Sequence, residues 1–597
     1  MVFSMNRSQG YLSAIRSEMK QNGIDAYILP HSDPHIGENI TDHWEIISWL
    51  TGFTGSAATV IVTDSFAGLW TDSRYFLQAE RQLEGSSFEL MGTTPGGFAS
   101  WYDWLVSRSG RHLNIGFDSR IFSLIDFREL KKKLSHKKVT FCTDFDPVTN
   151  IWKDRPPLPG GKAWDFAVEF SGKERSVKID EIRREMHKMD ANMHLLTSPD
   201  DIMWMLNIRG SDLQYSPLCQ SFAIVGSKQI LLFTDEEKIP DKIAGDFDNL
   251  GIVILPYLEC QEILSALTGE VTLLITPSVT SLSIYNSIPS GFRIIEDVSI
   301  PARLKAIKNT VEIENISRVM ISDGVALTRL FFWIERNRAV VPMSELSVTQ
   351  KLLELRSRQD EYIGPSFQPI VAYGHHSAMP HYSVTPETDS IIGENGILLI
   401  DSGGHYLRGT TDITRTISLG NPTQQQKIDF TLVLKGHIAL AGARFPHGTK
   451  GYQIDMLART PLWERGLNYG HGTGHGVGYC LNVHEGPQSI SPSDNKTSIE
   501  SGMLISNEPA LYREGEYGIR TENLVLCYLD EETEFGDFLK FDTVSLCYID
   551  MSLTDRSILT TKEIEWINSY HCMVFEKLSP HLSNEESIWL KEKTEAI

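Results

Sequence analysis

The sequence predicts two successive α/β domains followed by an α+β domain. Three observations support this: a length of 597 residues, a pattern that recurs within the first half, and helices alternating in blocks with strands after residue 305. At roughly 100–200 residues per domain, such a chain holds about three to five domains. We expect domains at residues 1–154, 162–304 and 305–597, the last ending in an extension from about residue 536 to 597.

The first predicted domain begins with an amphipathic helix at residues 11–20. Strands are expected at 25–30 and 59–64, and residues 67–80 read as a strand that continues into a helix. The segment RPPLPGG (155–161) is rich in proline and glycine, which cannot continue a helix or a central strand. We interpret it as a linker.

After this linker the pattern of the first domain recurs. Trp49 in ISWLTGFTGS is followed by the pair Thr71-Asp72, and Trp204 in IMWMLNIRGS is followed by Thr234-Asp235. Chance similarity between two α/β segments is the alternative. The retained order of features favours a duplication.

The region from 305 onward has a different pattern. The segment EIENISRVMISDGVALTRLFFWIE predicts a helix, because its apolar residues repeat at helical spacing. Further helices are expected at 425–444 and 452–465, and strands at 396–403, 412–419, 502–508 and 519–528. This mixture indicates an α+β domain.

Composition excludes several classes of function. The net charge of −22 argues against binding nucleic acid or an anionic membrane through a positive field. No stretch approaches 18 apolar residues, and the N-terminal segment has no apolar core of signal-peptide length. The seven cysteines form no Cys-x-x-Cys pair, which argues against a thiolate zinc site or a redox pair. An odd, sparse set of cysteines in a long chain indicates a reducing compartment. We therefore expect a cytoplasmic protein.

Two aspartates lie at the ends of apolar runs. Asp401 ends ILLID and Asp412 begins DITRTISL, with the turn-like SGGHYLRGTT between them. The runs are predicted to pair as a hairpin, which would bring both carboxylates together. A single aspartate at a strand end is more often a turn cap. Two carboxylates in apolar runs need a partner, and a metal ion is a suitable one.

Three more residues complete a candidate metal shell. His475 lies in HGTGHGVG, whose glycines allow close approach of the backbone and make a helix improbable. Glu508 in NEP and Glu522 in RTEN resemble the two aspartates in their placement, since each lies in or at the end of an apolar strand. Four carboxylates and one imidazole are too few for two separate ions. They suffice for two ions about 3.5–4 Å apart if some carboxylates bridge.

The strings DSG with a second Asp, HGTGHGVG, VHEGP, NEP and RTEN, in this order, resemble the pita-bread metallopeptidases. Within that family the chain is most similar to the three-domain, cytosolic Xaa-Pro aminopeptidases. The front strings WLTGFTGSA and WTDSRYFLQA resemble the first creatinase-like domain of that group. The resemblance implies a C-terminal pita-bread catalytic domain preceded by two related creatinase-like α/β domains.

The resemblance also implies how the metal ligands are shared. Asp401 would chelate one ion, Asp412 and Glu522 would bridge both, and His475 and Glu508 would hold the second ion. The family usually uses manganese, and oxygen-rich ligation suits a hard ion such as Mn(II).

Further roles follow from the same resemblance. Glu508 would handle the proton of the attacking water, and His381 and His484 would bind substrate and stabilise the oxyanion. His471 would line the substrate site, and Arg520 would orient ligands or substrate. A hydroxide shared by the two ions would then attack the bond between an N-terminal residue and a following proline.

Three questions stay open at this stage. An Xaa-Pro dipeptidase is the nearest alternative function, and a non-catalytic pita-bread module that binds peptides is another. The resemblance suggests a homodimer. His375 and His376 depart from the family pattern, and we interpret them as surface residues or as residues behind the site rather than as pocket lining.

Overall fold

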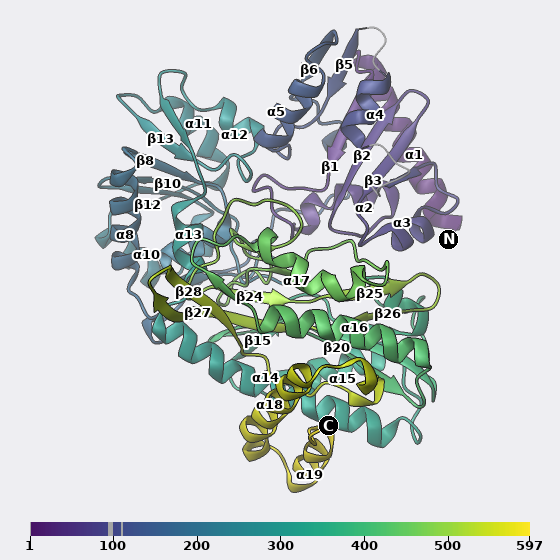
Figure 1. Ribbon diagram of the computed structural model, residues 1–597. Coiled ribbons are helices and arrows are strands. Elements are labelled where there is room, and N and C mark those ends of the chain that lie inside the picture. The colour runs from purple at the N-terminus through teal and green to yellow at the C-terminus, as the bar shows by residue number, and fades with distance from the viewer. Residues whose placement is uncertain (1, 93–99, 109–111) are drawn as a thin grey trace. The chain divides into compact units, whose positions relative to one another are not determined.

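The computed structural model describes residues 2–92, 100–108 and 112–597 (Figure 1). The chain forms two compact units. The first comprises Met1–Phe166 and Lys173–Pro301, and the second comprises Ala167–Gly172 and Ala302–Ile597. The predicted linker segment, residues 155–161, forms neither helix nor strand.

The first unit contains two six-stranded sheets with the same strand order. The first sheet consists of β4 (Glu89–Gly92), β3 (Ala67–Thr71), β2 (Ala58–Thr63), β1 (Ala26–Pro30), β5 (Leu113–Gly116) and β6 (Val139–Cys142). The second consists of β12 (Ile252–Leu255), β11 (Ile230–Phe233), β10 (Phe222–Gly226), β8 (Met193–Leu196), β13 (Thr272–Ile275) and β14 (Arg293–Glu296).

The two sheets also agree in strand direction. β2 is antiparallel to β1 and β3, as β10 is to β8 and β11, and every other neighbouring pair is parallel. Trp49 lies on α2 (Ile46–Thr51) after β1, and Trp204 lies on α9 (Pro199–Leu206) after β8. The prediction of two related α/β domains is confirmed.

Helices precede, separate or follow the strands of both sheets along the chain. In the first domain these are α1 (Val2–Gln21), α3 (Phe76–Leu83), α4 (Trp101–Arg108), α5 (Leu124–Lys133) and α6 (Val148–Ile151). In the second they are α8 (Arg175–Lys188), α10 (Asp241–Asn249), α11 (Cys260–Ala266) and α12 (Leu282–Asn286), with the short strands β7 (Trp164–Asp165) and β9 (Ile208–Arg209) beside them.

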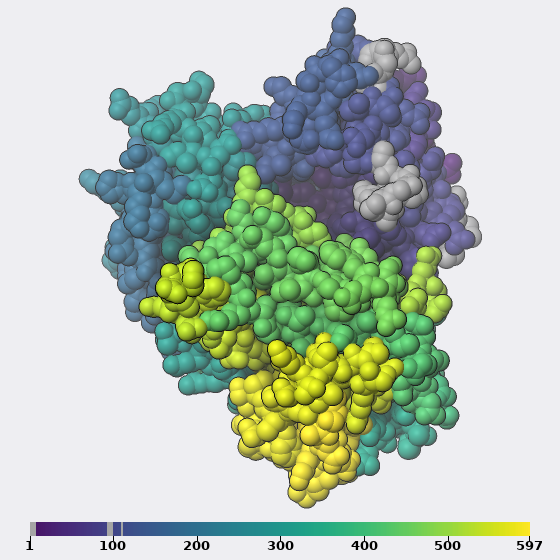
Figure 2. Space-filling view, viewed as in Figure 1, coloured from purple at the N-terminus to yellow at the C-terminus, as the bar shows by residue number. Residues whose placement is uncertain are grey.

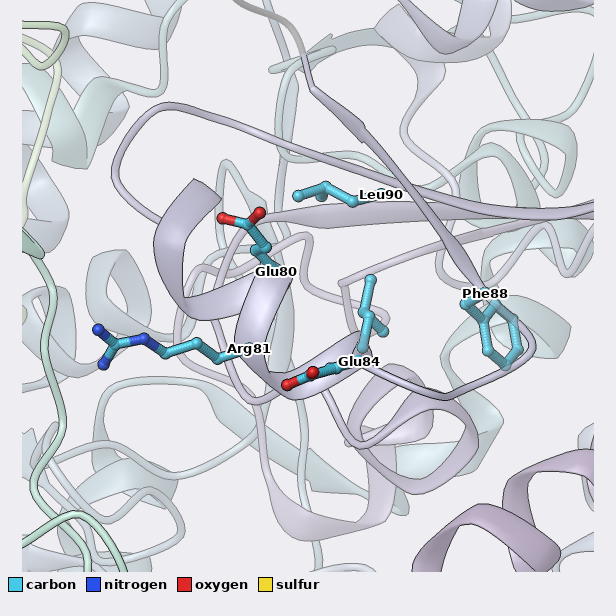
Figure 3. A pocket seen from close by; sticks show the side chains of 6 residues that line it. Glu80, Arg81, Glu84, Phe88 and Leu90 are labelled. Carbon is cyan, nitrogen blue, oxygen red and sulfur yellow. The ribbon is translucent and has the colours of Figure 1, made fainter. Parts of the chain in front are cut away.

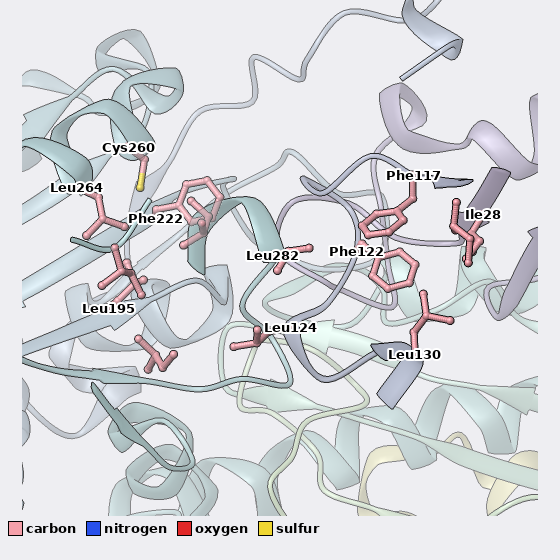
Figure 4. Close-up of a cluster of buried hydrophobic side chains, with 14 of the residues drawn as sticks. Ile28, Phe117, Phe122, Leu124, Leu130, Leu195, Phe222, Cys260, Leu264 and Leu282 are labelled. Atoms are coloured by element: carbon pink, nitrogen blue, oxygen red, sulfur yellow. The ribbon is translucent and has the colours of Figure 1, made fainter. Parts of the chain in front are cut away.

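One hydrophobic cluster joins the two sheets of this unit. It extends from Ile28 and Phe122 in the first domain to Leu282 and Leu195 in the second (Figure 4). The backbone amide of Leu282 donates to the carbonyl oxygen of Phe122 at 2.8 Å. Because burial of apolar surface and backbone hydrogen bonds act at the same junction, the two domains pack as one unit.

The second unit contains several small, antiparallel sheets. One consists of β16 (Ile370–Tyr373), β17 (Gly396–Ser402) and β20 (Ile413–Leu419), and another of β21 (Arg444–Pro446), β28 (Gly536–Thr543), β27 (Asn523–Thr533) and β24 (Leu504–Asn507). A third consists of β15 (Tyr362–Pro365), β18 (Gly404–Tyr406) and β19 (Gly409–Thr410). Two pairs complete the set: β22 (Gly474–His475) with β23 (Ser489–Ile490), and β25 (Ala510–Arg513) with β26 (Tyr517–Arg520).

Long helices pack around these sheets. They are α14 (Thr310–Asn337), α15 (Glu345–Ser357), α16 (Gln424–Ala441), α17 (Gly451–Trp463), α18 (Thr561–Leu578) and α19 (Asn584–Lys593), and α13 (Ile300–Ala306) precedes them. The predicted helix at 312–335 is α14, which begins with a capping box between Asn309 and Glu312. The C-terminal helices form a continuous part of the surface, in yellow in Figure 2. No helix among the described residues is long and apolar enough to cross a bilayer.

Two expectations about the strands were incomplete. The segment between Asp401 and Asp412 is not a simple turn, because β18 and β19 pair with each other within it. The predicted strand at 519–528 is interrupted at Thr521 and Glu522, which separate β26 from β27. This interruption leaves the Glu522 carboxylate outside the regular strand alternation.

Candidate dinuclear metal site

Asp401 and Asp412 come from one antiparallel strand pair. Asp401 lies near the end of β17, opposite Thr414 of β20, and Asp412 directly precedes β20. Both side chains are buried, with 8% and 4% of their surface exposed. The register that pairs the apolar runs therefore brings the two carboxylates together.

Glu508 and Glu522 come from a second strand pair. Asn507 of β24 lies opposite Asn523 of β27, so that Glu508 follows one strand where Glu522 precedes the other. The two pairs are joined at Thr414, whose hydroxyl donates to Glu522 Oε2 at 2.8 Å and whose carbonyl oxygen accepts from the Glu522 amide at 3.1 Å. All four carboxylates thus converge on one place.

The glycines around His475 allow this short strand to lie directly against β24. A Cβ atom on Gly474 would overlap the backbone carbonyl of Ser506, and one on Gly476 would overlap the carbonyl oxygen of Glu485. The His475 amide donates to Ser506 Oγ at 2.9 Å. The glycines of this motif are needed for close packing rather than for binding phosphate.

Replacement of Gly474 by alanine is therefore expected to displace His475. The added methyl must push apart two backbones, and such overpacking typically costs about 1–3 kcal/mol. Thermal unfolding and metal content would measure the effect. Gly364→Ala is the matched control, because no atom lies within 4 Å of the Cβ position there. Unchanged metal content in Gly474→Ala would contradict this account.

The structure brings all five predicted ligands together. Three overlapping groups have ligand atoms within 4.8 Å of one another: Asp401, Asp412 and Glu522; His475, Glu508 and Glu522; and Asp412, His475 and His484. His475 Nε2 lies 3.4 Å from Asp412 Oδ2 and 3.5 Å from Glu508 Oε1. Asp412, Glu522 and His475 each belong to two groups, and of these three a carboxylate offers two oxygens, as a bridging ligand requires.

Electrostatics and hydrogen bonding show that these residues fit cations. Burial raises the pKa of Glu522 and Asp401, and burial likewise raises the pKa of Glu508 to about 7. The neighbouring carboxylates add to each of these increases. Asp401 Oδ1 is buried and has no hydrogen-bond partner among the described residues. Bound cations would relieve this repulsion and would take up the unpaired oxygen.

Arg520 bonds three residues of the site. Its guanidinium pairs with Asp401 Oδ2, donates to Thr414 Oγ1 at 3.1 Å and donates to Tyr512 OH at 2.5 Å. Sequence reasoning named Arg520 but missed Thr414 and Tyr512. Thr414 has no local signal in the sequence, because it meets Glu522 only through long-range pairing, whereas Tyr512 meets Arg520 through the hairpin of β25 and β26.

The three candidate histidines differ in position. His484 packs against His475 with ring centroids 4.4 Å apart, and it shares a ligand group with Asp412. His471 Nε2 lies 2.9 Å from Tyr512 OH, which links it to Arg520. His381 directly follows Pro380, whose carbonyl oxygen accepts from Arg520 at 3.3 Å. All three histidines therefore come from segments that contact either the proposed metal ligands or Arg520 and Tyr512 beside them.

His375 and His376, which depart from the family pattern, lie in a 3-10 turn, Gly374–Ala378. His375 is exposed, whereas His376 is buried, with 5% of its surface exposed. The Nδ1 atom of His376 lies 2.9 Å from Glu345 Oε1, and its ring stacks on Tyr382. His376 is thus not a surface residue, and it belongs to none of the three ligand groups.

A separate hollow of about 440 Å³ lies in the first α/β domain. Its lining comes from α3 and β4, with two carboxylates, one guanidinium and apolar side chains (Figure 3): Glu80, Arg81, Leu83, Glu84, Phe88 and Leu90. No predicted site residue contributes to it, so it has no part in the chemistry described below.

Comparison with known families divides the chain into four matched segments. Residues 314–528 match metallopeptidase family M24, and residues 537–597 match the C-terminal region of peptidase M24. Residues 12–150 and 154–312 each match the creatinase/prolidase N-terminal domain. The pita-bread domain and the two creatinase-like domains of the predicted fold are confirmed.

Full-length relatives agree with these matches. A "Probable Xaa-Pro aminopeptidase P" of Laccaria bicolor is 37% identical over 98% of this chain and 92% of the relative. "Xaa-Pro aminopeptidase 1" of Dictyostelium discoideum is 36% identical over 98% and 96%. The chain is also similar to a solved structure, the crystal structure of an X-prolyl aminopeptidase from Caenorhabditis elegans, which is described as a cytosolic enzyme with a di-nuclear active site. The two superpose with a TM-score of 0.94 at 34% identity, covering 99% of this chain and all of that one. The chain belongs to metallopeptidase family M24, among the Xaa-Pro aminopeptidases.

Proposed function

We propose that this enzyme removes the first residue from peptides that carry proline in second position, using two divalent ions. The observation that carries the proposal is the convergence of four carboxylates and one imidazole in overlapping ligand groups. Asp401 would hold one ion, His475 and Glu508 the other, and Asp412 and Glu522 both. Two such ions supply an activated water and polarise the carbonyl of the scissile bond. We propose Mn(II) for both positions, since hard oxygen ligands dominate the set.

Glu508 is the residue best suited to move the proton. Its side chain is 20% exposed, whereas Asp412 and Glu522 are almost fully buried. Ser506 Oγ donates to Glu508 Oε1 at 3.3 Å, which orients the carboxylate. We propose that Glu508 accepts the proton of the attacking water and passes it to the leaving prolyl nitrogen.

The surrounding residues would bind and orient the peptide. His484 lies beside His475 and can donate to the oxygen on which negative charge develops. We assign His381 the same task, because its segment is tied to Arg520. His471 and Arg520, linked through Tyr512, would keep the substrate side of the site in place.

A pair of peptides tests the proposal. Ala-Pro-Ala is expected to be cleaved at least about 100-fold more efficiently than the dipeptide Ala-Pro, with kcat/KM followed by release of free alanine. Ala-Ala-Ala is the control for the need for proline. The opposite preference would identify an Xaa-Pro dipeptidase. A protein that binds no metal and cleaves neither peptide would be a non-catalytic binding module.

Three further assignments accompany this proposal. We propose domain boundaries at 1–154, 162–304 and 305–597, with the C-terminal extension starting near residue 536, which limited proteolysis can test. We propose a homodimer, on the family resemblance, and sedimentation analysis would measure it. We propose a cytoplasmic location, since all seven cysteines lie among the described residues and none forms a disulfide.

A further inference from the structure

Two of the site histidines lie on opposite sides of a backbone cross-link. The amide of Glu485 donates to the carbonyl oxygen of Gly476 at 2.8 Å. His475 directly precedes Gly476, and His484 directly precedes Glu485, so this hydrogen bond sets the spacing between the two imidazoles. Their ring centroids are 4.4 Å apart. The position of Glu485 therefore determines where His484 lies relative to the ligand His475.

The Glu485 side chain belongs to a buried group of charges. Its Oε2 lies 3.0 Å from Lys305 Nζ, and its Oε1 lies 3.9 Å from Lys308 Nζ. All three side chains are at most 2% exposed. A Cβ atom on Gly478 would come within 2.5 Å of Glu485 Oε2, so the glycine leaves room for this carboxylate.

Lys308 is anchored just before β24, the strand that ends beside Glu508. The amide of Lys308 donates to the carbonyl oxygen of Gly502 at 2.9 Å, and Ile307 forms a β-bridge with Met503, just before β24. β24 ends at Asn507, next to Glu508. Lys308, which pairs with Glu485, is therefore fixed beside β24, the strand that positions the proposed metal ligand Glu508.

We infer that Lys305, Lys308 and Glu485 form a positioning device that holds His484 against His475 at the metal site. Buried ions that are paired on several sides resist displacement, because separating them leaves an uncompensated charge in the interior. Residues behind a metal site commonly act in this way on the residues that face the metal. The inference rests on the proposed function, in which His484 contacts the substrate.

A double-mutant cycle between Glu485 and His484 tests the inference. The four proteins are the parent, Glu485→Gln, His484→Ala and the double variant, each assayed with Ala-Pro-Ala. Glu485→Gln is expected to lower kcat/KM about 10- to 100-fold in the parent, and less than about 3-fold when His484 is already alanine. Affinity for an analogue of the tripeptide with a reduced scissile bond, measured by calorimetry, should show the same pattern. Equal losses in both backgrounds, or no loss in either, would overturn the inference.

Controls separate positioning from simple loss of fold. Metal content should stay at two ions per chain in Glu485→Gln. Asp212→Asn removes a comparably buried partner of a lysine in the first unit, where Lys238 Nζ lies 2.8 Å from Asp212 Oδ2. Asp212→Asn is expected to lower the unfolding temperature, but it should leave the effect of His484→Ala on kcat/KM unchanged. Lys305→Arg should keep most of the activity, because the charge is kept.

A second variant covers the case in which Glu485→Gln does not fold. Lys305→Met leaves Glu485 paired with Lys308, and its loss of kcat/KM should likewise shrink when His484 is alanine. An undiminished loss would refute the positioning role. A parent enzyme that neither cleaves Ala-Pro-Ala nor binds its reduced analogue would instead refute the proposed function. A parent that does both but shows no coupling between Glu485 and His484 would refute only the positioning role.

Discussion

Replacement of Glu508 by glutamine is expected to lower kcat for Ala-Pro-Ala at least about 1,000-fold while the fold is retained. Glutamine keeps the shape of the side chain but can neither accept the proton of the attacking water nor contribute a negative charge to a cation. Its amide can still occupy the place next to Ser506, which donates to Glu508 Oε1. The loss should therefore fall on the chemical step rather than on folding.

Three measurements define this test. Turnover is followed with saturating Mn(II), metal per chain by mass spectrometry, and folding by thermal unfolding. Glu514→Gln is the matched control, because Glu514 lies exposed in the turn after β25. Turnover by Glu508→Gln within about ten-fold of the parent would remove Glu508 from the proton transfer.

The convergence of the proposed ligands was predictable because three of the four carboxylates have a local signature. Asp401, Asp412 and Glu508 lie at the ends of apolar runs, where a charge without a partner is costly. The structure places these run ends beside one another, as the antiparallel pairing of the runs requires. The duplicated front half was predictable for a similar reason, since a recurring order of features reflects a recurring sheet.

The supporting residues carried no such signature. Lys305 lies 180 positions from its partner Glu485, and Arg520 pairs with Asp401 only because β26 lies beside β17. His376 is buried beside Glu345, which reaches it from the start of α15, so of the two interpretations of His376 the surface one is wrong. Such contacts follow from the packing of distant segments, which one sequence does not reveal.

Removal of the metal ions is expected to abolish activity and to destabilise the catalytic unit, more strongly at higher pH. In the metal-free protein, burial together with the neighbouring carboxylates raises the pKa of Asp401 and Glu522, and it raises that of Glu508 to about 7. A carboxyl group whose pKa is raised by folding stabilises the fold at low pH. That contribution is lost as the pH rises through the folded-state pKa.

The same carboxylates determine how the stabilisation by metal ions depends on pH. Above pH 7 Glu508 is charged and adds to the repulsion within the site, so cations bind well and relieve the repulsion. Near pH 5 protons occupy the site and compete with the cations. Ions at about 100 times their dissociation constant stabilise the fold by about 2.7 kcal/mol, provided that they do not bind the unfolded chain. The gain in unfolding temperature on adding Mn(II) should therefore be larger at pH 8 than at pH 5.5.

Glu522→Gln supplies the decisive comparison for this prediction. Glu522 belongs to two of the three ligand groups and is 1% exposed, so a neutral side chain there removes both a bridge and a source of repulsion. The metal-free variant should lose less stability between pH 5.5 and 8 than the metal-free parent, and Mn(II) should stabilise it little at either pH. A variant that keeps the full response of the parent to Mn(II) would show that the ions bind without this bridge. Asp412 would then have to join the two ions alone.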